Sequence, residues 1–298
     1  MTGVEEPSRS GRPSGPGHRL AFIQRHPVTA FVVTVLAIGW PLLAVPPIVG
    51  LPTGPFLIVL TLVVLLGTAL FITRLADRPG AIRLLLSRIL IWRFSPWRWA
   101  LILFGVPVLT VAIAAVSGTF QQPDSGWGAA MRSYLFDTLV IGALMINLWE
   151  ETAWSGFVQS RLMSRHGLLG GSLVTAVFFA GIHVPLQFQT GWTWSDAAAG
   201  LGVLFGASPF YRYLLGMHLL DTRGSILAVA VQHASWNAAG KIDGVSGWWQ
   251  PVAAMVLLTV LIAIGRRLWR AESRPMGLDE ERTSAAEWTA VSSPLAAS

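Results

Sequence analysis

Residues 28–49 read VTAFVVTVLAIGWPLLAVPPIV, and no charged residue occurs anywhere from Pro27 to Thr73. A membrane-spanning helix needs about 20 predominantly apolar residues, so this run is long enough for two spans. Shorter uncharged runs recur at 99–123, 138–149, 167–195 and 244–265. The pattern predicts an all-α fold, a polytopic bundle of transmembrane helices.

The composition of the whole chain also indicates a membrane protein. Of its 298 residues, 53% are hydrophobic and only 12% are charged, which is about half the charged share of a soluble domain. The basic excess comes almost wholly from arginines between apolar runs, and this favours membrane topology over nucleic-acid binding. The absence of cysteine excludes disulfides and thiolate chemistry. We expect a multi-pass protein of an inner or plasma membrane, surrounded by the lipid bilayer, with no nucleic-acid partner.

The apolar runs predict about eight spans. They lie near 28–49, 56–73, 99–117, 136–158, 169–188, 197–220, 225–241 and 248–265. Arginines in short loops mark the cytoplasmic side of a membrane. They occur before the first span and after the second, fourth, sixth and eighth, which predicts that both termini are cytoplasmic.

The segments before and after the apolar runs flank a single predicted membrane domain, 28–270. Residues 1–27 are rich in Ser, Gly, Pro and Arg and predict a disordered basic tail, and 271–298 predict a second disordered tail. A signal peptide is disfavoured because the apolar run that follows is too long and lacks a small-residue cleavage pattern. The Arg- and Trp-rich segment 74–98 predicts either an amphipathic helix on the inner leaflet or an ordinary basic loop.

Two acidic residues, Glu150 and Glu151, interrupt the fourth predicted span. An ionisable side chain at membrane depth costs about 2.5–3.5 kcal/mol on insertion scales, so such residues are usually functional. The alternative is that the span ends near Trp149 and that both carboxylates face water.

Other spans carry polar residues at a similar depth. His183 lies in the fifth span, and His233 and Asn237 are four apart in the seventh, so they share one helix face. A single His or Asn in a span usually makes an interhelical hydrogen bond. With a rise of about 1.5 Å per residue, Glu150 and His233 lie about 16 and 15 Å from cytoplasmic arginines, and His183 about 18 Å from Gly171. We expect these groups to face one another around a common water, because none can face lipid.

These residue types suit hydrolysis of a peptide bond. A carboxylate and an imidazole that share a water can deprotonate it, which would make Glu150 the base and His183 the group that positions the water. A His–Asn pair on one helix face supplies donors for an oxyanion, a role that suits His233 and Asn237. The chain has neither a G-x-S-x-G elbow nor an H-E-x-x-H zinc helix. Ser235 has no base beside it, and we interpret it as a packing residue.

Three ordered motifs carry a resemblance to a known family. They are Glu150-Glu151 followed by Trp154-x-Gly156, then Phe179-x-x-x-His183, then His233-Ala-x-x-Asn237 after Thr222-Arg-Gly-Ser-Ile226. Together they resemble the type II CAAX prenyl proteases and bacteriocin-processing enzymes, the CPBP family, over residues 134–240. The resemblance implies a helical bundle of eight or so spans with its protease core at 134–240. It also implies endopeptidase activity by an intramembrane glutamate mechanism, although members were long labelled metalloproteases.

The resemblance also implies roles for single residues. Glu150 would be the water-activating carboxylate, His183 its partner, His233 and Asn237 the oxyanion stabilisers, and Glu151 the second glutamate of the first motif. That motif usually reads Glu-Glu-x-x-x-Arg-Gly in the family.

One position departs from the family motif. Ser155 stands where the family has arginine, which favours altered or absent activity because a cation near the glutamates is lost. Arg212, about 13 Å deep, is a candidate replacement that would pair with Glu150 or Glu151. The alternative is that Arg212 snorkels to the cytoplasmic interface.

Several functions stay open on the sequence alone. The leading one is an intramembrane endopeptidase that cleaves a peptide or membrane-protein substrate and requires no cofactor. In a metal-dependent version, Glu150, His183 and His233 would bind zinc. A catalytically weak or inactive relative would act as a membrane scaffold, chaperone or immunity protein. A transporter would use the same polar groups as a proton relay, but it predicts internal symmetry that the chain does not show. The sequence identifies neither the substrate nor whether it is prenylated.

Overall fold

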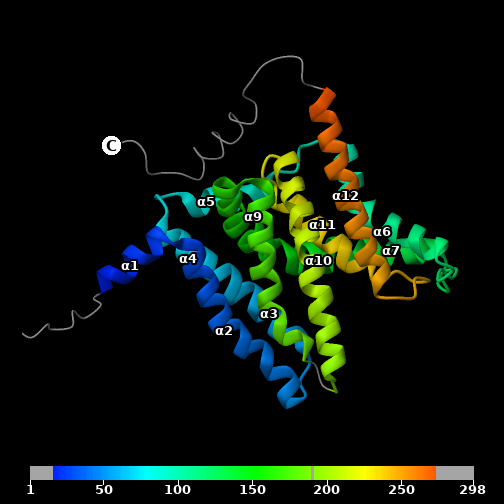
Figure 1. The fold of residues 1–298 in the computed structure, drawn as a ribbon, viewed down its shortest axis with the longest axis horizontal. Helices are drawn as coiled ribbons and strands as arrows, with labels where there is room; N and C mark the ends of the chain where they lie inside the picture. The colour runs from blue at the N-terminus through cyan, green and yellow to red at the C-terminus, as the bar shows by residue number, and fades with distance from the viewer. Residues whose placement is uncertain (1–15, 189–190, 273–298) are drawn as a thin grey trace, which may run out of the picture.

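The computed structural model describes residues 16–188 and 191–272, and within them every regular element is a helix (Figure 1). The elements are α1 (Pro16–Arg25), α2 (Pro27–Val49), α3 (Thr53–Val59), η1 (Leu60–Leu66), α4 (Gly67–Ala76), α5 (Ala81–Ser87), η2 (Arg88–Leu90), α6 (Pro96–Val116), α7 (Trp127–Phe136), η3 (Asp137–Asn147), α8 (Leu148–Glu151), η4 (Thr152–Gln159), α9 (Ser160–Ile182), η5 (Val184–Gln187), α10 (Trp194–Asp221), α11 (Ile226–Ala239) and α12 (Trp249–Glu272). This confirms the predicted all-α fold class.

Two of the helical rods are assembled from several elements. The first runs through α3, η1 and α4, and the second runs from α7 through η3, α8 and η4 into α9. The second rod bends sharply at Gly167, whose φ of 70° and ψ of 177° are far from helical values and favour glycine. The chain turns back so tightly there that a Cβ on Gly171 would lie 2.6 Å from Met163 Cα.

The short helix α11 lies in the middle of the bundle. It packs against η3, α6, α8 and α10, and most of its residues are buried (Figure 1). Helix α9 packs against α10 and α2, while α12 packs against α6 and α10. The polar residues of α11 are therefore surrounded by helices that precede it in the sequence.

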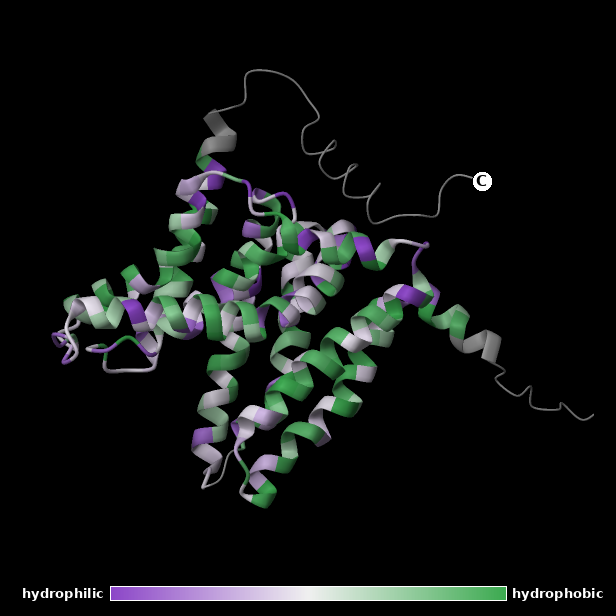
Figure 2. Cartoon of the chain, turned by 180° about the vertical axis from the view of Figure 1, so that it is seen from behind, coloured by the Kyte–Doolittle hydropathy of each residue, from purple (hydrophilic) through white to green (hydrophobic). Residues whose placement is uncertain are grey.

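The outer helices present apolar side chains. Figure 2 shows hydrophobic residues along most of α2 and of the rod formed by α3, η1 and α4. Large side chains on these helices are exposed, among them Val33 at 61%, Ile48 at 79% and Val63 at 65%. Such a surface is expected where helices contact lipid tails.

The structure contains fewer long apolar helices than the eight predicted spans. Within the described residues, five helical runs are long and apolar enough to cross a membrane, at 27–49, 53–76, 96–116, 127–182 and 249–268. The predicted span 136–158 and most of the predicted span 169–188 fall within one run, which ends at 182. Helix α11 has only 14 residues, or about 21 Å, against about 30 Å of hydrocarbon. The count of eight and the side of the termini stay predictions.

The N-terminal prediction was wrong for part of the chain. Residues 16–25, which were expected within a disordered tail, form α1, and α1 contacts α2 and α4. Its Ile23 packs against the core, and Gln24 Nε2 donates to Leu75 O at 3.3 Å. Apolar residues at helical spacing explain this helix. The rest of the predicted tails, 1–15 and 273–298, lies outside the described residues.

The basic segment 74–98 is neither of the two forms expected from the sequence. It contains the short helix α5 and the single turn η2, followed by extended chain before α6. Arg88 points inward and donates to Gly224 O at 2.9 Å, Gly156 O at 3.1 Å and Ser160 Oγ at 3.2 Å. The segment is therefore anchored to the bundle by one of its own arginines.

Candidate active site

The two glutamates lie on one turn of α-helix between two π-helical segments. Glu150 and Glu151 end α8, and the segments on either side, η3 and η4, are π-helical. Such wide turns often occur at functional sites because they redirect side chains. Glu150 is 8% exposed and Glu151 is fully buried, so the alternative in which both carboxylates face water is wrong.

Glu150 faces His183. Its Oε1 lies 4.0 Å from His183 Nε2, and the side chains keep 11% and 23% exposure. His183 Nδ1 lies 2.6 Å from Phe179 O. A carbonyl oxygen only accepts hydrogen bonds, so Nδ1 carries the hydrogen and, in the neutral ring, the lone pair of Nε2 faces the carboxylate. The side chains of this pair keep partial exposure, whereas Glu151 has none.

Glu151 faces His233. His233 Nδ1 donates to Glu151 Oε1 at 2.9 Å, and Ser155 Oγ donates to Oε2 of the same carboxylate. Because a carboxylate accepts, Nδ1 again carries the hydrogen and Nε2 is the free nitrogen of the ring. Of the four groups expected around one water, Glu150 and His183 form one pair. His233 instead pairs with Glu151, the next residue of α8, and Asn237 lies beside this second pair.

Arg212 of α10 completes the second pair. It is fully buried, and its Nη1 donates to Glu151 Oε1 at 3.0 Å and to Oε2 at 3.1 Å. The predicted pairing with one of the glutamates is confirmed, and the snorkelling alternative is wrong. A cation therefore accompanies Glu151 although Ser155 holds the motif's arginine position.

Asn147 connects His233 with Asn237, and sequence reasoning gave it no role. With its amide oxygen toward α11, Asn147 accepts from Asn237 Nδ2 at 3.3 Å, from His233 Nδ1 at 3.3 Å and from Ala234 N at 3.2 Å. Asn237 itself is exposed. A buried amide one helical turn before Glu151 was the pattern that could have indicated this residue.

Aromatic rings hold both imidazoles in place. The Phe179 ring centroid lies 4.6 Å from that of His183 and 6.1 Å from that of His233, and Arg212 Cζ lies 5.2 Å from the same ring. Tyr211 packs on His233 at 5.2 Å. Such contacts limit the rotation of each imidazole and exclude water from its faces.

The residues of this site lie within a segment that matches a known protein family. Residues 132–239 match the family model described as type II CAAX prenyl endopeptidase Rce1-like. This segment is similar to the CAAX endopeptidase family. It contains all five predicted site residues, Glu150, Glu151, His183, His233 and Asn237, as well as Asn147 and Arg212. No curated protein matches the chain. At family level, the match supports a membrane-embedded peptidase.

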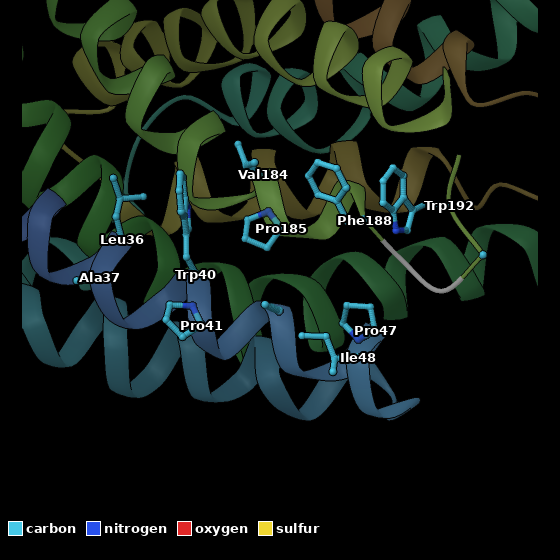
Figure 3. Close-up of a pocket in the computed structure, with 12 residues that line it drawn as sticks. Leu36, Ala37, Trp40, Pro41, Pro47, Ile48, Val184, Pro185, Phe188 and Trp192 are labelled. Atoms are coloured by element: carbon cyan, nitrogen blue, oxygen red, sulfur yellow. The ribbon is translucent and has the colours of Figure 1, made fainter. Parts of the chain in front are cut away.

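An apolar groove of about 860 Å³ lies beside the CAAX endopeptidase site (Figure 3). One side is α2, and the other is the chain that follows His183. The lining residues are Leu36, Ala37, Trp40, Pro41, Ala44, Pro47, Ile48, Val184, Pro185, Phe188, Gly191 and Trp192. None of them is charged, and Trp40 Nε1 donates to Gly181 O at 2.9 Å, which ties α2 to the end of α9.

The zinc alternative fits the CAAX endopeptidase site poorly. Among the residues that the structure describes, no group of three or more His, Asp and Glu side chains is placed to hold a metal ion. Glu151 Oε1 and His233 Nδ1 bond to each other. His183 Nδ1 bonds to the backbone. These bonds leave Nε2 of both rings free, so zinc is disfavoured only by the placement of Glu150, His183 and His233, which do not gather as a three-ligand cluster.

Ser235, between the two polar residues of α11, belongs to a different contact. Its Oγ donates to Leu103 O at 2.9 Å and accepts from Tyr134 OH at 2.9 Å. These bonds link α11 to α6 and α7. They agree with the interpretation of Ser235 as a packing residue.

Proposed function

We propose that this protein is an intramembrane endopeptidase in which Glu150 and His183 activate a water molecule. The observation that carries the proposal is the 4.0 Å separation of Glu150 Oε1 and His183 Nε2, whose side chains both keep partial exposure. The separation is too long for a direct hydrogen bond. It suits a bridging water about 2.8 Å from each atom.

In the proposed reaction, Glu150 takes one proton from this water while the oxygen attacks the carbonyl carbon of the peptide bond. His183 Nε2 accepts a hydrogen bond from the second water hydrogen, which directs the oxygen lone pair toward the carbonyl. The tetrahedral intermediate then collapses, and the C–N bond breaks. Glu150 returns its proton to the leaving amine, so one carboxylate serves as base and then as acid.

We propose that His233 and Asn237 stabilise the oxyanion of this intermediate. One hydrogen of Asn237 Nδ2 is held by Asn147, which leaves the second for the oxyanion. His233 Nδ1 carries a hydrogen bonded to Glu151, so its Nε2 donates only when the ring is an imidazolium. The carboxylate of Glu151 stabilises that cation, as carboxylates do in other His-dependent hydrolases. Glu151 thus supports His233 and is not a second base.

The groove suggests the class of substrate. It adjoins His183 directly through Val184, it contains no charged residue, and one of its walls is α2, whose Trp40 and Ile48 are exposed. We propose that it takes an apolar segment or a lipid-like tail of a peptide that approaches within the membrane. The proposed chemistry requires no metal ion.

The test is cleavage of a peptide library that contains apolar segments by purified protein, with products identified by mass spectrometry. E150Q and H233A should abolish cleavage. D124N, which changes an exposed carboxylate outside the site, should leave it unchanged. Binding of peptides without turnover by the unchanged protein would contradict the proposal and favour a scaffold or chaperone. Loss of cleavage in chelator that zinc specifically restores would favour the metal-dependent version.

A further inference from the structure

The guanidinium of Arg212 is bound through all three of its nitrogens. Besides the two bonds from Nη1 to Glu151, Nη2 donates to Ser155 Oγ at 2.9 Å, and Nη2 and Nε donate to Gln159 Oε1 at 2.6 and 3.0 Å. The acceptors at 151, 155 and 159 are each four residues apart, so they form one face of α8 and η4. A single side chain of α10 therefore binds two turns of the helix that carries the glutamates.

The backbone of α10 around Arg212 also contacts Gln159 closely. Gln159 Nε2 donates to Arg212 O at 2.7 Å and to Ser172 Oγ at 3.0 Å, so Gln159 holds the arginine at both ends. One helical turn after Arg212, a Cβ on Gly216 would lie 2.7 Å from Gln159 Nε2. The close approach of α10 to η4 thus depends on glycine at 216 and on the Gln159 amide.

Arg212 and His233 donate hydrogen bonds to the same oxygen atom of Glu151. Glu151 Oε1 accepts from Arg212 Nη1 at 3.0 Å and from His233 Nδ1 at 2.9 Å. A fully buried carboxylate without a cation carries a large desolvation penalty and is expected to take up a proton instead. A protonated Glu151 would no longer stabilise an imidazolium at His233.

We propose that Arg212 is a positioning residue of the active site: it keeps Glu151 ionised and thereby keeps His233 able to donate from Nε2. The inference rests on the proposed function. It also assigns a role to Ser155, whose hydroxyl lies between the guanidinium and the carboxylate. Because Nη2 lies 2.9 Å from Ser155 Oγ, a long side chain at 155 would overlap the guanidinium. The cation of this site is thus supplied from α10, and a small residue at 155 makes room for it.

The first test removes the charge and then moves it. R212Q should lower kcat about 100-fold or more while KM changes little, because a group that orients a catalytic histidine acts on the transition state. The double variant S155R/R212S, which returns a cation to the other helix, should recover at least about tenfold of that loss. A folded R212Q protein with the kcat of the unchanged protein would overturn the inference.

A second variant answers the objection that R212Q loses activity only because it misfolds. E151Q/R212Q removes both buried charges and should fold, since neutral replacement of a buried ion pair is often tolerated. It should remain as slow as R212Q because His233 has lost its carboxylate. Recovery of full kcat in this variant would show that the arginine acts on folding alone and would overturn the inference.

A spectroscopic measurement separates this inference from the proposed function. In protein with 15N-labelled histidine rings, the His233 signals, assigned by their loss in H233A, report which ring nitrogens are protonated. R212Q should change the protonation of the His233 ring, whether or not a cleavable peptide has been found. Unchanged His233 signals would overturn the role of Arg212, whereas absence of cleavage by the unchanged protein would overturn the proposed function only.

Discussion

Glu150 and Glu151 are neighbours in the sequence and lie in opposite environments. Glu150 lies 4.0 Å from the imidazole of His183 and its side chain keeps 11% exposure, whereas Glu151 is fully buried between Arg212 and His233. A carboxylate that water reaches can exchange protons with a substrate water. One enclosed by a guanidinium and an imidazole is suited to hold a fixed charge. This difference supports the proposed roles, in which Glu150 carries the chemistry and Glu151 supports His233.

Substitution by glutamine should separate these two roles. E150Q should lower kcat by a factor of about 10²–10⁴, the usual contribution of a general base, with little change in the unfolding temperature in detergent. E151Q should lower both kcat and the unfolding temperature, because it leaves Arg212 as a buried cation without its anion, at a cost of about 3–5 kcal/mol. Equal unfolding temperatures for E150Q and E151Q would contradict the assignment.

The ring of His183 should be needed for its Nε2 and not for its Nδ1. Asparagine at 183 can keep a donor to Phe179 O but offers nothing at the Nε2 position, so H183N should fold normally and lose kcat by about 100-fold. The matched control is H166N, which changes an exposed histidine outside the site. Steady-state kinetics of both variants provides the measurement, and a fully active H183N protein would remove His183 from the mechanism.

Filling the groove should affect substrate binding more than chemistry. A44F places a ring among Trp40, Pro47 and Phe188, and it should raise KM about tenfold for a peptide with an apolar segment while kcat at saturation is kept. The control, A100F, adds the same ring at an exposed alanine of α6. If the KM of A44F, like that of A100F, equals the KM of the unchanged protein, the substrate does not bind in the groove.

Chelators should leave the activity unchanged. Among the described residues, no group of three or more His, Asp and Glu side chains is placed to hold a metal ion. Rates measured after dialysis against a strong chelator should therefore equal those of untreated protein. A loss that zinc restores and magnesium does not would support metal-assisted hydrolysis instead.

The sequence indicated the fold class and the main polar residues because both depend on patterns within single helices. Long apolar runs predict spanning helices, and Glu150, His183 and His233 stand out because they interrupt such runs. The contact between Arg212 and Glu151 could be proposed but not established, because depth along two helices does not fix which faces meet. The arrangement as two pairs depends on the π-helical turns around α8, and no periodicity predicts those turns.

Asn147 provides the sharpest test of the oxyanion assignment. Its amide oxygen is the acceptor that the structure gives Asn237 Nδ2, and it also receives His233 Nδ1. In N147L the apolar side chain has similar size but accepts nothing, so both donors lose a fixed partner and kcat should fall by about tenfold or more. The loss of buried hydrogen bonds should also lower stability by about 1–3 kcal/mol. If kcat falls in N147L while KM is kept, Asn237 and His233 act on the transition state. If N147L keeps its kcat, the donors of α11 need no orientation from η3, and the oxyanion must be bound elsewhere.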